Sequence, residues 1–217
     1  MLRHHLCLLL LPLVSATALG QVTLKLSVGG TVIGTVTAGQ HLTAAGNKVI
    51  EVQTVLKRGD KEARLVTRSE YAADGTPVEM FESFVPDDSS GEQHTNVEFD
   101  SAGAHAARNA GDGWKSKDLE LDAKRSRACT YEFWFLRDQP KTGDKVTAFY
   151  FDVDKLAWVD RTTTYVGPTN VSINGKLLPS FHIRTTSGDQ VIDAYVDDKG
   201  RPLRITNGDT EMVRSDL

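Results

Sequence analysis

Cysteine is nearly absent from this chain, which has two among its 217 residues, Cys7 and Cys129. Cys7 lies in an apolar N-terminal run that has the pattern of a leader. A chain that keeps one cysteine cannot close an internal disulfide and has no thiolate cluster for a metal. Cys129 lies beside aromatic residues, a setting typical of a buried, inert thiol, although a reactive or intermolecular thiol stays open. The fold must therefore be held by its core.

Spaced metal ligands are missing as well. The histidines beyond the leader never lie two or four residues apart; they are His41, His94, His105 and His182. Asp152-Val153-Asp154 resembles the start of a calcium loop, but Leu156 and Ala157 stand where an oxygen ligand and a turn glycine should be. The sequence also lacks a Gly-x-Ser-x-Gly motif. We therefore expect no metal, no cofactor and no assigned catalytic residue.

Long apolar runs are limited to one, Leu6–Val14, which follows Arg3 and two histidines and precedes small residues up to Gly20. This order predicts a signal peptide over residues 1–20, since the run is too short to span a bilayer. We expect residues 21–217 to form a single exported domain, periplasmic or secreted, without an integral membrane segment. Cleavage would change the net charge from −4 to −5, which argues against a nucleic-acid partner.

Beyond the leader the sequence shows no helical periodicity. Apolar and polar residues alternate there instead. Residues 22–28 alternate apolar with polar side chains, and similar runs recur between glycine-containing turns at short spacing. This pattern predicts an all-β fold, a curled antiparallel meander that forms a half-barrel or open barrel. Residues 131–136 are expected to be one of its strands. Residues 86–127 are expected to be a long irregular excursion, with a strand near Val97 and Phe99 and with either a returning strand or a short helix over residues 102–110.

One strand–turn–strand phrase occurs twice, as Tyr71-Ala72-Ala73-Asp74-Gly75-Thr76-Pro77-Val78 and as Tyr195-Val196-Asp197-Asp198-Lys199-Gly200-Arg201-Pro202-Leu203. Asp and Gly tolerate the backbone of tight turns, and Pro is accepted at the first residue of a strand. We expect two equivalent hairpins, which arose by duplication or by convergent turn chemistry.

Aromatic residues gather in strands that are apolar on both faces, and such strands are covered on both sides. They either pack in the core or line a cavity for an apolar ligand. In the second case the ligand-binding residues are Tyr131, Phe133, Trp134, Phe149, Phe151 and Trp158.

Two other functions stay open at the level of sequence. Ser180 and His182 share a strand face, with Asp189 or Asp193 across a hairpin, so a secreted hydrolase that uses this set or a pair of carboxylates is an alternative. A structural or partner-binding module that pairs through an exposed sheet edge is another.

The C-terminal half carries features in a characteristic order: Phe135-Leu136-Arg137, then Pro140-Lys141-Thr142-Gly143-Asp144, and finally the second strand–turn–strand phrase. This order resembles an exported bacterial β-meander family catalogued as a domain of unknown function. It is more remotely similar to the Lol-type half-barrel lipoprotein carriers. The resemblance implies a curled antiparallel sheet, export and no established catalytic residues, and the Lol comparison implies an apolar groove. The favoured hypothesis is an exported, non-catalytic half-barrel that binds an apolar or lipid-like ligand or acts in cell-envelope assembly.

Overall fold

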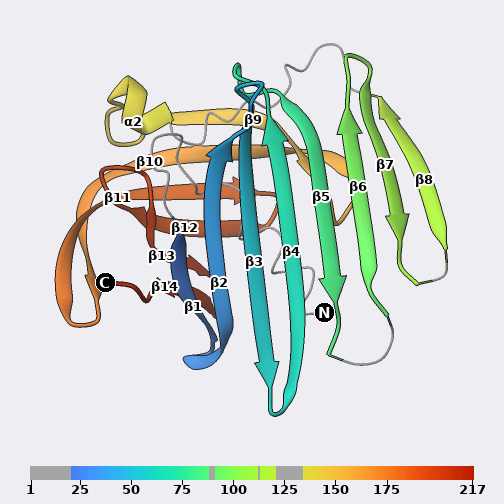
Figure 1. The fold of residues 1–217 in the computed structure, drawn as a ribbon. Helices are drawn as coiled ribbons and strands as arrows, with labels where there is room; N and C mark the ends of the chain where they lie inside the picture. The colour runs from blue at the N-terminus through green and yellow to red at the C-terminus, as the bar shows by residue number, and fades with distance from the viewer. Residues whose placement is uncertain (1–20, 88–90, 112, 121–133) are drawn as a thin grey trace.

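The computed structural model describes residues 21–87, 91–111, 113–120 and 134–217. In these residues one antiparallel sheet of fourteen strands accompanies one short helix (Figure 1). The strands of the first half are β1 (Val22–Val28), β2 (Thr31–Leu42), β3 (Lys48–Arg58), β4 (Lys61–Tyr71), β5 (Pro77–Val85), β6 (Gln93–Phe99), β7 (Gly103–Asn109) and β8 (Trp114–Glu120). The second half contains helix α2 (Trp134–Asp138) and strands β9 (Lys145–Asp152), β10 (Ala157–Ile173), β11 (Lys176–Ser187), β12 (Gln190–Val196), β13 (Pro202–Asn207) and β14 (Thr210–Arg214).

The strand order is that of two meanders joined at their chain ends. Every described neighbour pair is consecutive in sequence except β1 and β14, which pair with each other in the middle of the sheet. From this junction the sheet runs outward through β2 to β8 on one side and through β13 to β9 on the other, without closing into a barrel. The all-β, curled antiparallel meander expected from the sequence is confirmed.

The two halves of the sheet face each other across the core. Figure 1 shows β2 to β8 as one layer, with β9 to β12 crossing behind it at a steep angle. Alternate residues of each strand point into the space between the layers, because side chains alternate across a sheet. Leu24 and Leu26 of β1, Val36 of β2 and Ile183 of β11 belong to the same buried cluster. The period-two pattern of the sequence is therefore the pattern of the core.

The repeated phrase forms the same turn twice. The amide of Ala72 donates to the carbonyl of Thr76, and that of Gly75 donates to Ala72, both at 2.8 Å. Asp197, Gly200 and Arg201 repeat the two bonds at 3.0 Å, with Gly75 at φ +86° and Gly200 at φ +75°. The turn over residues 43–47, between β2 and β3, has this pattern too. Three occurrences in a meander favour convergent turn chemistry over duplication.

Where the structure describes residues 86–127, they do not form an irregular excursion, and this part of the sequence prediction is wrong. The described part of the segment contains β6, β7 and β8. The strand at Val97 and Phe99 was expected, β7 is the strand alternative for residues 102–110, and β8 was not expected. Strand β7 is rich in alanine and β8 is charged and mostly exposed, so both lack the alternation of a half-buried strand. The ladders of β7 with β6 and of β8 with β7 outweigh this weak local preference.

The expected strand over residues 131–136 is also incorrect where the structure describes it. Trp134–Asp138 is the helix α2, and residues 131–133 lie outside the described residues. Trp134 and Phe135 are adjacent and both buried. The Phe135 ring stacks on Tyr165 at 6.3 Å and meets Phe181 edge-on at 6.2 Å. A short run of aromatic residues favours a strand in the sequence pattern. Here the packing of Phe135 on Tyr165 and Phe181 favours a helix instead.

Hydrogen bonds connect β7 and β8 to the turn of the β9–β10 hairpin. We call this contact the Arg108 seam. The Arg108 guanidinium donates to the carbonyls of Val153 and, at 3.1 Å, Asp154, and its Nε donates to Thr95 at 3.0 Å. Lys117 of β8 reaches the carbonyl of Leu156 at 3.4 Å. These bonds satisfy turn carbonyls and hold the curl of the sheet.

We expect Arg108→Met to lower the free energy of unfolding by about 1–3 kcal/mol, because the variant keeps the aliphatic stem and loses three hydrogen bonds of a charged donor. Amides of the β9–β10 hairpin should exchange faster with deuterium. The control is Arg64→Met, since the Arg64 side chain is 52% exposed and pairs weakly with Glu62 at 3.5 Å; its change should stay within about 0.5 kcal/mol. Equal effects of the two substitutions would contradict the role of the seam.

Candidate functional site

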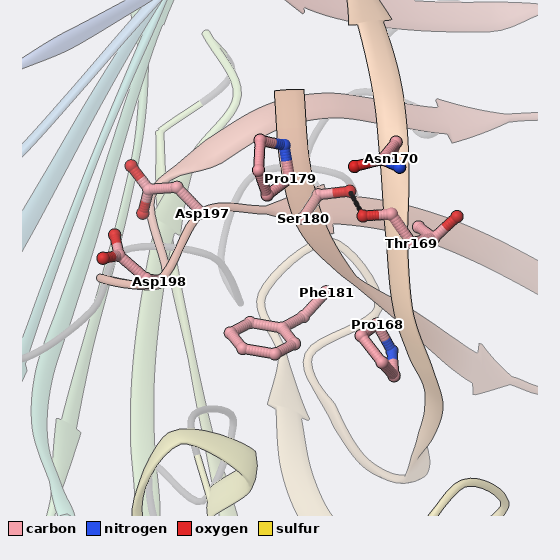
Figure 2. Close-up of a pocket in the computed structure, with 8 residues that line it drawn as sticks. All are labelled: Pro168, Thr169, Asn170, Pro179, Ser180, Phe181, Asp197 and Asp198. Atoms are coloured by element: carbon pink, nitrogen blue, oxygen red, sulfur yellow. Dashed lines mark hydrogen bonds between the residues drawn. The ribbon is translucent and has the colours of Figure 1, made fainter. Parts of the chain in front are cut away.

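The hollow in Figure 2 lies between the β10–β11 hairpin and the β12–β13 turn. It has a volume of about 600 Å³ and is lined by Pro168, Thr169, Asn170, Pro179, Ser180, Phe181, Asp197 and Asp198. We call it the hairpin groove. Strand β12 pairs with β11 with Val196 opposite Phe181, so the turn that follows Val196 lies beside the groove. The pairing of consecutive strands therefore places the β10–β11 hairpin and the β12–β13 turn on the two sides of the groove.

The hairpin supplies an apolar wall. Leu177, Pro179 and Phe181 alternate along β11 and therefore share one face. The ladder places Pro168 opposite Phe181 and Asn170 opposite Pro179, on that same face. Leu177 is 68% exposed, whereas Phe181 is half-buried and packs on Phe135 and Tyr165. An apolar stripe thus runs from solvent to the aromatic core.

Two carboxylates face this wall, and they differ in their partners. Asp197 accepts hydrogen bonds from the amides of Lys199 and Arg201, both at 2.9 Å, and from Arg201 Nε at 2.7 Å. These bonds form the turn, so Asp197 is structural. Asp198 is exposed, and among the described residues its side chain has no hydrogen bond or ion pair. Asp198 is therefore the carboxylate that the groove offers to a ligand.

The candidate hydrolase residues are only partly brought together. His182 Nε2 lies 2.6 Å from Asp193 Oδ1, and the imidazole stacks on Tyr195 with ring centroids 4.6 Å apart. Ser180 Oγ instead donates to the carbonyl of Thr169 at 3.3 Å (Figure 2). Within the described residues no hydrogen bond joins Ser180 to His182. The His–Asp half of a triad is present, but this serine is not its nucleophile.

Asp193 contacts two basic side chains of β11, Arg184 and His182. Arg184 donates to its two carboxylate oxygens at 2.8 and 3.2 Å, in addition to the contact with His182. Burial opposes ionisation of Asp193, but the hydrogen bonds from Arg184 and His182 outweigh it and lower the pKa of the carboxyl. This cluster stabilises the charged surface of the β11–β12 hairpin and needs no catalytic role.

Three of the aromatic residues proposed from sequence, Trp134, Phe151 and Trp158, lie in or against the core and not in the groove. Phe151 and Trp158 contact each other and Phe99 of β6, with centroids 5.2 to 5.8 Å apart. Trp134 is buried on α2, and Phe149 lies on β9. Tyr131, Phe133 and the side chain of Phe149 lie outside what the structure describes. Ligand contact by this set stays a prediction.

The residues of the hairpin groove were not singled out from sequence as a binding site. The alternation of Leu177, Pro179 and Phe181 was a usable signal, because two apolar residues and a proline on one strand face need a cover. The second aspartate of the Asp197-Asp198 turn was another, since one carboxylate suffices to make the turn.

The described residues hold neither a cluster of metal ligands nor a membrane-spanning helix. No three His, Cys, Asp or Glu side chains come together there as a metal site. None of the helices described is both long enough and apolar enough to cross a membrane.

The fold is similar to that of a solved bacterial protein. A β-barrel-like protein of the domain of unknown function DUF1849 from Brucella abortus superimposes with a TM-score of 0.58 at 12% identity, over 89% of this chain and 93% of that one. A DUF1089 family protein from Pseudomonas aeruginosa gives a TM-score of 0.42 at 15% identity, over 77% and 87%. No protein-family model and no curated protein sequence matches this chain. The first likeness shows a shared barrel-like fold, in agreement with the resemblance to a β family of unknown function; it identifies no activity.

We expect Asp193→Asn to lower the free energy of unfolding at pH 7 by about 1 kcal/mol, because a partly exposed ion pair contributes little more than that. The Asp193 pKa is lowered in the folded state, so its contribution is present above the unfolded value near 3.9 and is lost as the pH falls through the folded value. Urea unfolding at pH 7 and pH 3 should show the gap between wild type and variant closing in acid. Asp189→Asn, at an exposed turn residue, is the control; a gap for Asp193→Asn that is independent of pH would contradict this reading.

Proposed function

We propose that this chain is a non-catalytic binding protein whose hairpin groove takes a lipid-like amphiphile with a cationic head. The observation that carries the proposal is the juxtaposition of the apolar stripe of β11 with the free carboxylate of Asp198. Small-molecule sites combine mainly apolar walls with a few polar groups that fix orientation, and the groove has this composition.

The apolar part of the ligand lies along Pro168, Pro179 and Phe181. Leu177 continues the stripe outward, so a chain longer than the groove still finds apolar surface. Each methylene transferred from water to such a surface contributes roughly 0.8 kcal/mol when fully buried, and less in an open groove. Affinity should therefore rise with chain length.

The cationic head lies at Asp198. The carboxylate is exposed, so its attraction for an ammonium group is screened and selects among ligands more than it strengthens binding. Asp197 is held by Arg201 and contributes no free charge. The leader-like residues 1–20 favour an exported protein, for which amphiphiles of the cell envelope are accessible ligands.

The test compares octylammonium, octanol and octanoate, which share one chain and differ in head group, by isothermal titration calorimetry of the full chain. We expect octylammonium to bind most tightly and octanoate least. Asp198→Asn should weaken octylammonium by up to about fivefold, the equivalent of about 1 kcal/mol for an exposed pair, and leave octanol unchanged. Asp189→Asn, at an exposed carboxylate of the β11–β12 turn, should change neither.

A second variant tests the groove itself. Asn170 is exposed, lies on the groove face opposite Pro179 and has no side-chain hydrogen bond among the described residues. Trp is well tolerated in strands, so Asn170→Trp should fold normally and fill the groove. We expect it to abolish binding of octylammonium and octanol together. Undiminished binding by Asn170→Trp, or equal affinity of wild type for all three head groups, would contradict the proposal.

A further inference from the structure

Strand β2 contains a glycine that the fold does not require. Its two glycines are Gly34 and Gly39. A Cβ at Gly34 would lie 2.1 Å from the carbonyl oxygen of Val55, so a side chain is excluded there. At Gly39 a Cβ would meet nothing within 4 Å, and Gly39 is not among the residues with positive φ. Glycine weakens a strand interior and often marks a place where a ligand approaches the backbone.

A hollow of about 440 Å³ lies over Gly39, on the face of the sheet that points away from the core. Thr37, Gly39 and His41 share that face of β2, and the ladder places Gln53 opposite Thr37 and Glu51 opposite Gly39. Val66 of β4 pairs with Gln53 and closes one side. The core residues Ala38 and Val52 are on the reverse face. In Figure 1 these strands stand in the layer nearer the viewer.

The rim of this hollow carries polar side chains that make no hydrogen bond within the described part of the chain, and one of them, His41, interacts electrostatically with Glu70. Among the described residues, the side chains of Thr37, His41, Glu51 and Gln53 take part in no hydrogen bond or ion pair. Arg68, directly opposite Glu51, pairs instead with Glu70 and Glu79 at 2.8 and 2.9 Å. The hollow thus combines a bare backbone floor with four side chains that donate or accept hydrogen bonds.

We infer that the hollow over Gly39 is a second binding site, for an uncharged saccharide. Hydroxyl, amide, imidazole and carboxylate groups around one floor match the ring of hydroxyls of a sugar, each of which both donates and accepts. The floor lets the sugar lie on the strand, and Val66 supplies an apolar contact for its C–H face. The volume is within the range of small-molecule sites, roughly 300–1,000 Å³. This site is separate from the hairpin groove and does not depend on its function.

The test is Gly39→Val in the full chain, with saturation-transfer NMR against maltose, cellobiose and N,N′-diacetylchitobiose as probes. Valine favours strands and its Cβ has open space, so the unfolding temperature should stay the same or rise. The side chain fills the floor, so we expect the saturation-transfer signal of the bound sugar to disappear. Gln53→Ala should weaken binding by threefold or more. Thr35→Val, at an exposed position of the same strand outside the hollow, should change nothing.

Three results would overturn the inference. The first is the lack of any saturation-transfer signal from the three sugars, each at about 20 mM, in the presence of the wild-type protein. The second is binding that survives in Gly39→Val. The third is a clear fall in the unfolding temperature of Gly39→Val, which would make Gly39 a structural residue. Asn170→Trp should leave the sugar signal intact, which separates this site from the hairpin groove.

Discussion

The pairing of β1 with β14 makes one sheet out of two meanders. Among the described strands it is the only ladder that joins distant parts of the chain, with Leu24 opposite Arg214 and Leu26 opposite Met212. Leu26 and Met212 are both fully buried, and Ser215 bonds Thr23 through its amide at 2.9 Å and its hydroxyl at 3.0 Å. All other described ladders are local hairpins. Without this one, two meanders would each expose an apolar face.

The junction also sets the curvature that places both candidate sites. Because the halves are joined in the middle, their outer strands can fold toward each other, and the Arg108 seam and the Phe99–Phe151–Trp158 contact hold them there. The face of the sheet that points inward is then covered by the packed side chains of the core. What is left for ligands is the long β10–β11 hairpin, which extends past the core, and the face of β2 and β3 that points away from it.

The sequence was sufficient for the fold class and insufficient for its details, for physical reasons. Alternation in β1 to β4 and the Asp-Gly turns are local signals, and the structure follows them. Strands β7 and β8 have weak local preference. Strand β7 forms because it pairs with β6, and β8 because it pairs with β7, and local sequence patterns do not contain this pairing. The helix that begins at Trp134 also depends on distant residues, because Phe135 packs against Tyr165 and Phe181. The hairpin groove needs the β11–β12 register, which places Asp198 opposite the stripe of β11. Neither the register nor the position of Asp198 can be inferred from single residues.

Under the proposed function, the ligand lies in the hairpin groove and not among the buried aromatic residues. Amide chemical-shift mapping of the isotope-labelled chain during an octylammonium titration distinguishes the two positions. We expect the largest shifts to cluster at residues 169–170, 177–181 and 197–199, and the amides of Phe151 and Trp158 to change little. Shifts concentrated at Phe99, Phe151 and Trp158 would place the ligand inside the curled sheet and contradict the account.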